Sequence, residues 1–482
     1  MKKPSKDVRA SALVFAVIAV LVLSMMVGEV VRVVTVKYMN VFHTASWQES
    51  LLAAESGIDL GMVELRKNIT NPGSAFQSPW VAATTGTSNS GVFSTSHAGE
   101  GGTNLNIQVT VDALSQLVDA QGWQYYRIRS TGSTIVPGVA RATDEKRDSD
   151  LRKLSLKVDR LTGLPIDRPK ATRRIEIIAK PMSPFNAAIL ARGLVDLTDH
   201  NIVIDSYDSR DPAKSTNGQY DPAKRQQNGD VATDGNLINA GNAYIYGDVA
   251  TNAGTVTDAA NVTGQQRTDF YQDVPSVNSP TWYTFNANPT AINNTTTIAA
   301  SPVKGSSASR YKLSQISLNG PNVLTVTGDP SGAPTYVEIW VTGDISISGQ
   351  GQIMLGNGVQ ASIYFAGDAS ISGNGITNGT SPNYDRPGNA ILYGIKPTDG
   401  STQTVSLSGN AAMEGAVYAP DANVTIDGGG TKGTFSGSVV GSTVKMTGVT
   451  TVHYDEAMTA RGNVTDYRIV SWFEDTSRGN VW

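Results

Sequence analysis

The chain of 482 residues is longer than the roughly 250–300 residues that one hydrophobic core supports, so we expect two or three domains. Its 38 basic and 42 acidic residues give a formal net charge of −4, and this balance, with no basic stripe, disfavours nucleic acid as a partner. The chain contains no cysteine, which excludes disulfides and thiolate metal sites.

An apolar segment, SALVFAVIAVLVLSMMVGEVVRVVTV, occupies residues 11–36 behind the basic leader MKKPSKDVRA. Between Ala12 and Val27 the only polar residue is Ser24. At a helical rise of ~1.5 Å per residue, this run is close to the shortest that spans a hydrocarbon core of ~30 Å. A secretory signal would end at a small-x-small cleavage site, whereas Gly28 leads directly into EVVRVVTV. The sequence therefore predicts a membrane helix that is retained.

An amphipathic pattern continues the same helix. Apolar residues recur at spacings of three and four, which draws one stripe along a helix: Leu51, Ala54, Ile58, Met62 and Leu65. The tripeptide Asn-Pro-Gly at 71–73 then ends the pattern. We expect one continuous helix over residues 11–69, ~85 Å long at the same rise. Its first half is membrane-like and its second half is amphipathic.

In detail, SALVFAVIAVLVLS followed by LLAAESGIDLGMVELRKNI resembles the N-terminal helix of the PilX-type minor pilins, a family of type IV pilin-like proteins. The resemblance implies that a prepilin peptidase removes the leader, residues 1–10, by cutting between Ala10 and Ser11. It also implies an inner-membrane anchor with the C-terminal region outside the cytoplasm, which later packs against other pilin subunits. The packing residues would be Leu13, Val14, Phe15, Val17, Ile18, Leu21 and Leu23.

Two residues depart from the pattern of the family. Ala10 stands where glycine usually precedes the cut, and Phe15 stands where a glutamate is expected at the fifth mature position. In a filament core such a glutamate pairs with the new amino terminus of a neighbouring subunit, so a chain without it suits a position with no subunit above it. This favours a minor or tip subunit. A membrane anchor that is never processed stays open as the alternative.

The middle region, residues 70–182, is expected to form a small domain with loops. Residues alternate between apolar and polar at 105–114, 123–133 and 173–180, which predicts three strands of one antiparallel sheet. The segment 141–163 is dense in charges of both signs, which indicates a solvated loop.

A short phrase of polar, apolar, polar residue and glycine recurs in the last third of the chain. Its apolar residues are predicted to face a core: Ile347, Ile371, Leu407, Ile426 and Met446. A second phrase, as in EIWVTGD and SIYFAGD, precedes each copy, so we expect two strands per repeat. Repeats of about 20–25 residues with glycine turns are typical of a parallel β-solenoid (β-helix). We assign residues 183–482 to it, with Tyr467, Trp472 and Phe473 as a C-terminal cap, and predict an α+β fold that is mainly β.

Sequence motifs in the C-terminal region support the same resemblance. The phrases GAVYAPD, DSYDS and VHYDEAM, with the ending YRIVSW, are similar to the C-terminal region of PilX-type pilus assembly proteins. The family supplies no catalytic residues to transfer, and we expect no catalytic, cofactor-binding or metal site.

Turn carboxylates leave an enzyme open as an alternative. Asp344, Asp368 and Asp421 follow glycine or proline at similar positions. On neighbouring repeats such acids could act as acid and base on a polysaccharide, or bind Ca²⁺. Aspartate is also favoured at turns for local hydrogen bonding, which is the interpretation that we prefer. The four histidines have no metal-site spacing: His43, His97, His200 and His453.

A surface adhesin is a further alternative. Two long insertions, residues 206–230 and 373–390, are predicted to be loops on a rigid scaffold, where recognition often resides. A glycan or protein ligand would contact Tyr207, Tyr220, Tyr384 and Arg386. The function that we expect overall is that of a structural pilin-like subunit of a type IV pilus or a secretion pseudopilus. Its partners would be other pilin subunits, the inner-membrane assembly machinery and the membrane.

Overall fold

The computed structural model describes residues 6–70, 74–82, 91–98, 104–118, 123–136, 170–199, 201–282, 288–378, 387–408, 413–428 and 433–475. The chain has one long N-terminal apolar helix and otherwise mostly β structure, including a large parallel sheet of barrel-like form. Two compact units divide it: Met1–Lys180 with Arg468–Trp482, here called the helix–sheet unit, and Pro181–Tyr467, here called the parallel-strand unit. The second unit is therefore an insertion into the first.

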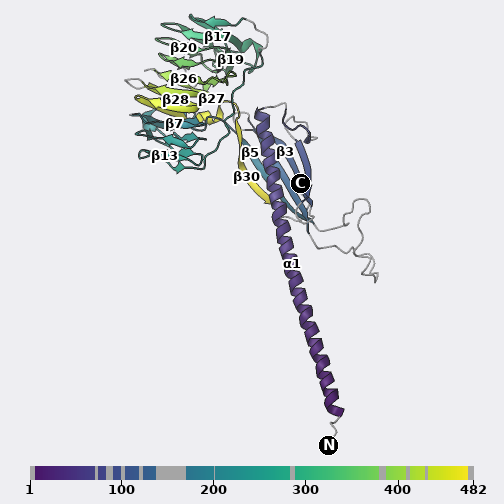
Figure 1. Cartoon of the computed structure of the whole chain (residues 1–482). Coiled ribbons are helices and arrows are strands. Elements are labelled where there is room, and N and C mark those ends of the chain that lie inside the picture. Colours follow the sequence, from purple (N-terminus) through teal and green to yellow (C-terminus); the bar gives the residue numbers. More distant parts are fainter. Residues whose placement is uncertain are drawn as a thin grey trace. The chain divides into compact units, whose positions relative to one another are not determined.

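Helix α1 runs without a break from Lys6 to Thr70, as predicted (Figure 1). Its two halves differ in burial. Residues 13–45 are exposed on every side of the helix, whereas from Ser46 onward one face is buried. The apolar side chains of that face include Ala53, Ala54, Ile58, Met62 and Leu65, which are between 0% and 6% exposed.

The amphipathic half of α1 packs on a six-stranded sheet, against β3 and β4. The sheet order is β1 (Val81–Ala82), β2 (Gly91–Ala98), β3 (Asn104–Val118), β4 (Gln124–Ile135), β5 (Lys170–Met182) and β30 (Asp466–Asp475). The pairs from β1 to β5 are antiparallel, and β3, β4 and β5 contain the three predicted strands. Helix and sheet approach closely because Gly57 and Gly132 carry no Cβ: one added at either would collide with Ser130 Oγ or Ser50 O.

The C-terminal tail does not cap the second unit, so the prediction of a cap was wrong. Strand β30 instead pairs with β5, although the two are separated by the whole inserted unit (Figure 1). Two ion pairs join their ends: Arg173 with Glu474, and Arg174 Nη1 with Asp475 Oδ2 at 3.4 Å. The alternation of YRIVSWFED suits an edge strand of a sheet as well as an end cap, which is why the pattern misled.

The parallel-strand unit contains a 20-stranded sheet. Its earlier strands are β6 (Ile189–Ala191), β7 (Leu194–Asp196), β8 (Val203–Tyr207), β9 (Val231–Thr233), β10 (Leu237–Asn239), β11 (Tyr244–Ile245), β12 (Val249–Thr251), β13 (Thr255–Thr257) and β14 (Gln266–Arg267). Its later strands are β15 (Thr290–Ile292), β17 (Arg310–Leu318), β19 (Thr335–Val341), β20 (Ile345–Ile347), β22 (Val359–Phe365), β23 (Ala369–Ile371), β25 (Ala390–Gly394), β26 (Gln403–Ser408), β27 (Met413–Asp427), β28 (Gly433–Thr447) and β29 (Thr450–Asp455). Short 3₁₀ helices are η2 (Pro222–Lys224), η3 (Ser307–Ser309), η4 (Pro387–Asn389) and η5 (Glu456–Ala460).

The strands stack in an order that differs from their order in the chain. Parallel pairing runs from β14 through β12, β9 and β6 to β28, and on through β27, β25, β22, β19 and β17 to β15. The chain thus starts in the middle at β6, builds outward to β14, crosses to the opposite end at β15, and returns to the middle. Figure 1 shows the result as teal β7 lying next to yellow β28.

The five predicted core residues occupy one column of this stack. Ile347 pairs with Ile371, Ile371 with Leu407, Leu407 with Ile426, and Ile426 with Met446. All five are buried, at 1% to 3% exposed. The glycine that ends the phrase takes a positive φ in three copies, Gly349, Gly373 and Gly448, which is the left-handed conformation that glycine tolerates best.

Four layers of the stack carry a third strand that the sequence pattern did not indicate. A separate four-stranded parallel sheet is built from β16 (Thr296–Ala299), β18 (Val323–Thr327), β21 (Gln352–Leu355) and β24 (Gly375–Thr377). It contributes its own buried column, including Leu324, Ile353 and Ile376, each 0% exposed. The expectation of two strands per repeat was therefore too low for this part of the unit.

Candidate functional site

The N-terminal half of α1 is a bare apolar surface. The seven residues predicted for helix packing are between 52% and 71% exposed: Leu13, Val14, Phe15, Val17, Ile18, Leu21 and Leu23. An 18-residue window of this helix is apolar enough to cross a membrane, and none of it is buried inside the protein. Ala10 and Ser11 lie in the first turns of α1. Farther along, Arg32 Nη1 pairs with Glu29 Oε1 at 3.4 Å across one helical turn.

A groove lies beside α1 where its bare half meets the sheet. It has a volume of about 360 Å³ and is lined by His43, Thr44, Trp47, Gln48, Leu51 and Arg173. The Arg173 guanidinium lies 4.7 Å from the centroid of the Trp47 ring and also pairs with Glu474 of β30. The sequence does not predict this groove, because its two walls are more than 120 residues apart in the chain.

The turn carboxylates link neighbouring layers of the parallel stack. Asp344 Oδ1 accepts the backbone N–H of Asp368 at 2.9 Å, and Asp368 Oδ1 accepts that of Thr404 at 2.8 Å. Asp421 has different partners: Arg192 Nη1 at 2.7 Å and Ser276 Oγ at 3.1 Å. Each of these carboxylates thus has an oxygen engaged in holding the fold, which favours the structural interpretation of Asp344, Asp368 and Asp421.

The same arrangement recurs in the earlier half of the unit. Asp230 Oδ1 accepts the N–H of Asp248 at 2.8 Å, and Asp248 Oδ1 accepts that of Gln265 at 2.7 Å. In all four cases the aspartate follows a glycine. At Gly247 and Gly367 an added Cβ would collide with the Gly-Asp pair of the preceding layer, so the dipeptide is the sequence signal of the link. The aspartates of the pairs at 343–344 and 367–368 are among the predicted turn carboxylates, whereas those of the pairs at 229–230 and 247–248 are not.

A segment that crosses the outside of the stack is also fastened by charged groups. Residues 269–282 run from the β14 end towards the β15 end. Asp234 Oδ1 accepts the N–H of Gln272 at 2.8 Å, and Arg192 Nε donates to Val274 O at 3.0 Å. Burial raises the pKa of Asp234 to about 6. The protonated form of this carboxyl is therefore favoured more than in an exposed aspartate.

A buried polar cluster, here called the polar seam, joins DSYDS to VHYDE. Strand β8 pairs in parallel with β29, which sets Asp205 beside His453. Asp205 accepts from Tyr220 at 2.7 Å and lies 2.5 Å from His453 Nδ1. The Tyr220 ring stacks on the imidazole with centroids 3.4 Å apart. Since Ser206 Oγ donates to Glu456 and not to the imidazole, this is no Ser–His–Asp arrangement.

The remaining part of the polar seam holds the loop after β8. Asp455 is fully buried, and its Oδ1 accepts the N–H groups of Ser209 and Ala457 at 2.9 and 3.0 Å. Burial raises its pKa despite these bonds. Glu456 accepts from Lys214 and Asn228. The loop 206–230 is thus tied to the core of the unit.

This arrangement corrects part of the adhesin hypothesis. Tyr207 is only 2% exposed, so its side chain is not presented to a ligand, whereas Tyr220 is half-buried, with its hydroxyl donating to Asp205 and its ring stacked on His453. Tyr384 and Arg386 lie outside the residues that the structure describes, as does His200.

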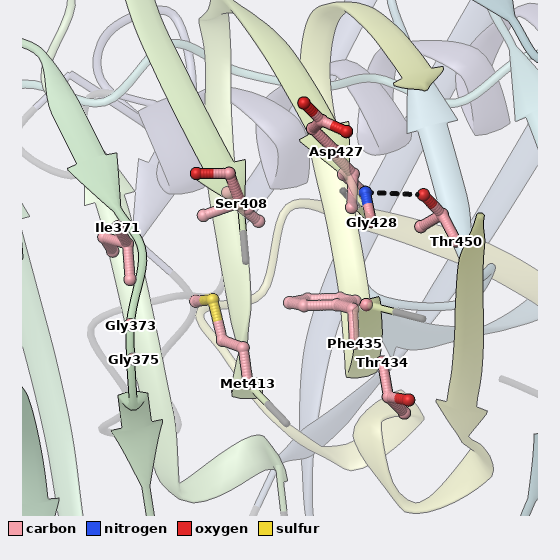
Figure 2. A pocket seen from close by; sticks show the side chains of 13 residues that line it. Ile371, Gly373, Gly375, Ser408, Met413, Asp427, Gly428, Thr434, Phe435 and Thr450 are labelled. Atoms are coloured by element: carbon pink, nitrogen blue, oxygen red, sulfur yellow. Dashed lines mark hydrogen bonds between the residues drawn. The ribbon is translucent and has the colours of Figure 1, made fainter. Parts of the chain in front are cut away.

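A small cavity lies between layers in the later half of the unit (Figure 2). Met413 and Phe435 line it together with the core residues Ile371, Leu407 and Ile426. Thr450 Oγ1 accepts the N–H of Gly428 at 2.9 Å at its edge. Its volume of about 30 Å³ has room for one or two water molecules, far less than the several hundred Å³ of a ligand pocket.

Within the described ranges, no group of three or more histidine, aspartate or glutamate side chains is arranged to hold a metal ion. Comparison with known proteins adds one match: a family model described as "Domain of unknown function (DUF7305)" covers residues 294–461. This range is most of the later half of the parallel-strand unit, from β16 to η5. No curated protein and no solved structure matches the chain.

Proposed function

We propose that the chain is a structural pilin-like subunit, anchored in the inner membrane by α1 and then built into a filament of the type IV pilus class. One observation carries the proposal: a single unbroken helix is bare and apolar over its first half and fixed to a sheet over its second. A bare apolar helix needs lipid or other apolar helices around it. The second half of α1 already has its apolar face covered by the sheet, so only the first half needs such surroundings.

The proposal includes a minor or tip position and leader cleavage between Ala10 and Ser11. Phe15 favours such a position, because it provides no carboxylate to pair with a neighbouring amino terminus. Other pilin subunits and the assembly machinery are the proposed partners.

We also propose that the parallel-strand unit is a β-solenoid. Supporting observations are the in-register columns of like residues, the layer-to-layer Gly-Asp links and the separate third sheet. In this account the unit has no catalytic role and binds no cofactor, since its repeated carboxylates are hydrogen-bonded to the next layer. A unit of this size would crowd a filament shaft, which also favours a tip or minor position.

A substitution in the apolar half of α1 tests the proposal. Ile18→Asp places a charge near the middle of the proposed span, at a cost of roughly 2.5–3.5 kcal/mol for membrane insertion. We expect the variant to be lost from the membrane fraction and from sheared filaments, whereas Ile18→Leu behaves as wild type. If the wild-type chain never sediments with filaments, or the aspartate variant sediments equally well, the proposal fails.

A further inference from the structure

A lysine, an asparagine and a glutamate side chain meet at the edge of the polar seam. Lys214 Nζ donates to Glu456 Oε2 at 3.1 Å, and Asn228 Nδ2 donates to Glu456 Oε1 at 2.7 Å. The amine and the carboxamide therefore lie side by side over the two oxygens of one carboxylate. Lys214 and Asn228 belong to the loop 206–230, whereas Glu456 comes from η5.

Each of these three residues is held in place by further contacts. The backbone N–H of Lys214 donates to Asp211 O at 2.9 Å. The backbone N–H of Asn228 donates to Ser206 Oγ at 2.8 Å, and this hydroxyl in turn donates to Glu456 Oε1 at 3.0 Å. The Glu456 side chain is only 14% exposed. Groups that the fold holds in contact react as if they were present at very high concentration, provided that the reacting atoms reach ~3–3.5 Å.

The three side chains are those that an amide exchange needs. A neutral amine is a nucleophile, a carboxamide carries an acyl carbon, and a carboxylate can take a proton and return it. Within the ion pair, a proton that moves from Lys214 to Glu456 leaves both groups neutral. A flip of the Asn228 carboxamide then lets the Glu456 O–H donate to Asn228 Oδ1, which polarises the carbonyl.

The structure hinders a competing reaction of Asn228. In an Asn-Gly sequence the backbone nitrogen of the glycine can attack the asparagine side chain, which leads to deamidation. Here the N–H of Gly229 donates to Tyr246 O at 2.8 Å, and a Cβ added at Gly229 would lie 2.8 Å from Asp205 Cα. The glycine backbone is thus fixed between layers, and Lys214 supplies the nucleophile instead.

We propose that Lys214 and Asn228 join in an isopeptide bond, formed once per chain with Glu456 as the group that takes and returns the proton. Lys214 Nζ attacks Asn228 Cγ, and the Cγ–Nδ2 bond breaks. One proton of the neutral amine passes by way of Glu456 to the departing nitrogen, which leaves as ammonia. The proton that Glu456 first took from the lysine ammonium leaves with it as an ammonium ion, so the carboxylate is restored and no oxidant or cofactor is needed.

The ion pair is the resting state before this reaction. The hydrogen bond to Glu456 raises the pKa of the Lys214 amine, so the neutral amine is a minor form. A small population of the neutral form slows the reaction. The Lys214 side chain is 34% exposed, however, so ammonia escapes into water and the step does not reverse. A slow but irreversible reaction still reaches completion.

The bond closes residues 214–228 into a covalent ring. The chain has no cysteine, so disulfides cannot fasten its loops. A covalent link of this kind stabilises a fold by restricting the unfolded chain, and an amide is not broken by reducing conditions. The inference concerns a single chain and does not depend on filament assembly.

Mass spectrometry of tryptic peptides tests the bond in the full-length chain extracted from membranes. In an unlinked chain, trypsin releases residues 211–214, 215–224 and 226–267 as separate peptides. We expect the wild type to give one branched peptide that joins residues 211–224 to residues 226–267. Its mass should be about 17 Da below the sum of the two parts, because ammonia is lost. Free residues 211–214 should be at least tenfold less abundant.

Three variants assign the roles of the residues. Glu456→Gln keeps the size of the side chain but cannot take the proton, and Lys214→Arg keeps the positive charge but cannot form the amide, so both should lose the branched peptide. Lys224→Arg is the matched control in the same loop. The Lys224 amine binds Pro212 O and Ser215 O, so this variant should give the branched peptide at the wild-type level.

The wild-type chain alone can overturn the proposal. Residues 211–214 recovered mainly as a free peptide would do so whatever the variants show, because this result does not depend on how a variant folds. A link from Lys214 to a residue other than Asn228 would also overturn it, as would an aspartate in place of Asn228. A branched peptide that persists at the wild-type level in Glu456→Gln would overturn the role of Glu456.

Discussion

At the scale of single residues, the Gly-Asp pairs explain how successive layers of the parallel stack are joined. The aspartate accepts a backbone N–H of the next layer, and the glycine lets the layers approach. An ionised acceptor of this kind strengthens a hydrogen bond relative to a neutral one. Removing the carboxylate would therefore weaken the link between layers.

The first prediction concerns Asp368. Replacing it with alanine leaves the N–H of Thr404 without its partner, and we expect a loss of about 1 kcal/mol in the free energy of unfolding. Asp368→Asn keeps an oxygen acceptor and should lose less. Denaturant titration measures both, with Asp399→Ala as the control, because Asp399 accepts from Ser401, two residues on in its own turn, and not from a neighbouring layer. Equal losses for the alanine and asparagine variants would contradict the account.

The second prediction concerns pH. Burial raises the pKa of Asp234 to about 6, above the ~3.9 of an unfolded chain, so the folded state binds the proton more tightly. The stabilising contribution is thus fully present below about pH 4 and is lost as the pH rises through about 6. Asp234→Asn should therefore raise Tm at pH 7.5 and change it less at pH 4.5.

Asp269→Asn is the matched control for this measurement. Its hydrogen bond from Arg267 lowers the pKa of Asp269, so neutralising it should bring no gain at pH 7.5. A Tm of the Asp234→Asn variant that falls below wild type at pH 7.5 would show that the charge at this position is stabilising.

At the scale of elements, the recurring phrase of polar, apolar, polar residue and glycine predicted the strands that carry the buried column from Ile347 to Met446. The apolar residue of each copy lies beside that of the next because a parallel stack in register brings equivalent residues together. The third strand of these four layers was not predicted because its copies, such as VLTVT, QIML and GIT, share no common pattern of residues. Their pairing shows only in the structure.

The third prediction concerns this column. Ile371 is 1% exposed and contacts the layers on both sides, so Ile371→Ala should lower the free energy of unfolding by about 2–5 kcal/mol. Ser370 precedes it on the same strand and is exposed, so Ser370→Ala should change stability by less than about 0.5 kcal/mol. A loss of similar size in both variants, measured by denaturant titration, would contradict the buried-column assignment.

The order of the layers could not be predicted from the repeats. Similar sequence repeats indicate that strands stack on one another, but they do not indicate which strands become neighbours. The segment 269–282 connects the two halves of the stack. It is held by hydrogen bonds to Arg192, Asp234 and Asp421, which come from distant parts of the chain. The position of β30 was missed for the same reason, since β5 lies almost 300 residues earlier.

At the scale of the whole molecule, the chain is a helix–sheet unit with a large parallel-strand unit inserted between two neighbouring strands. The helix and its two halves were predictable because hydropathy and spacing are local properties of the sequence. The groove at Trp47 was not, because it needs β5 beside α1. The apolar half of α1 remains exposed along its length, and a protein in water does not leave such a surface uncovered.

The state of the N-terminus in assembled material tests the central claim most directly, namely that α1 is kept and becomes part of a filament. The account predicts that mass spectrometry of the chain from sheared filaments finds a first residue of Ser11, with the apolar segment intact. A mature protein that begins beyond Gly28, or one recovered only as a soluble extracellular form, would contradict it.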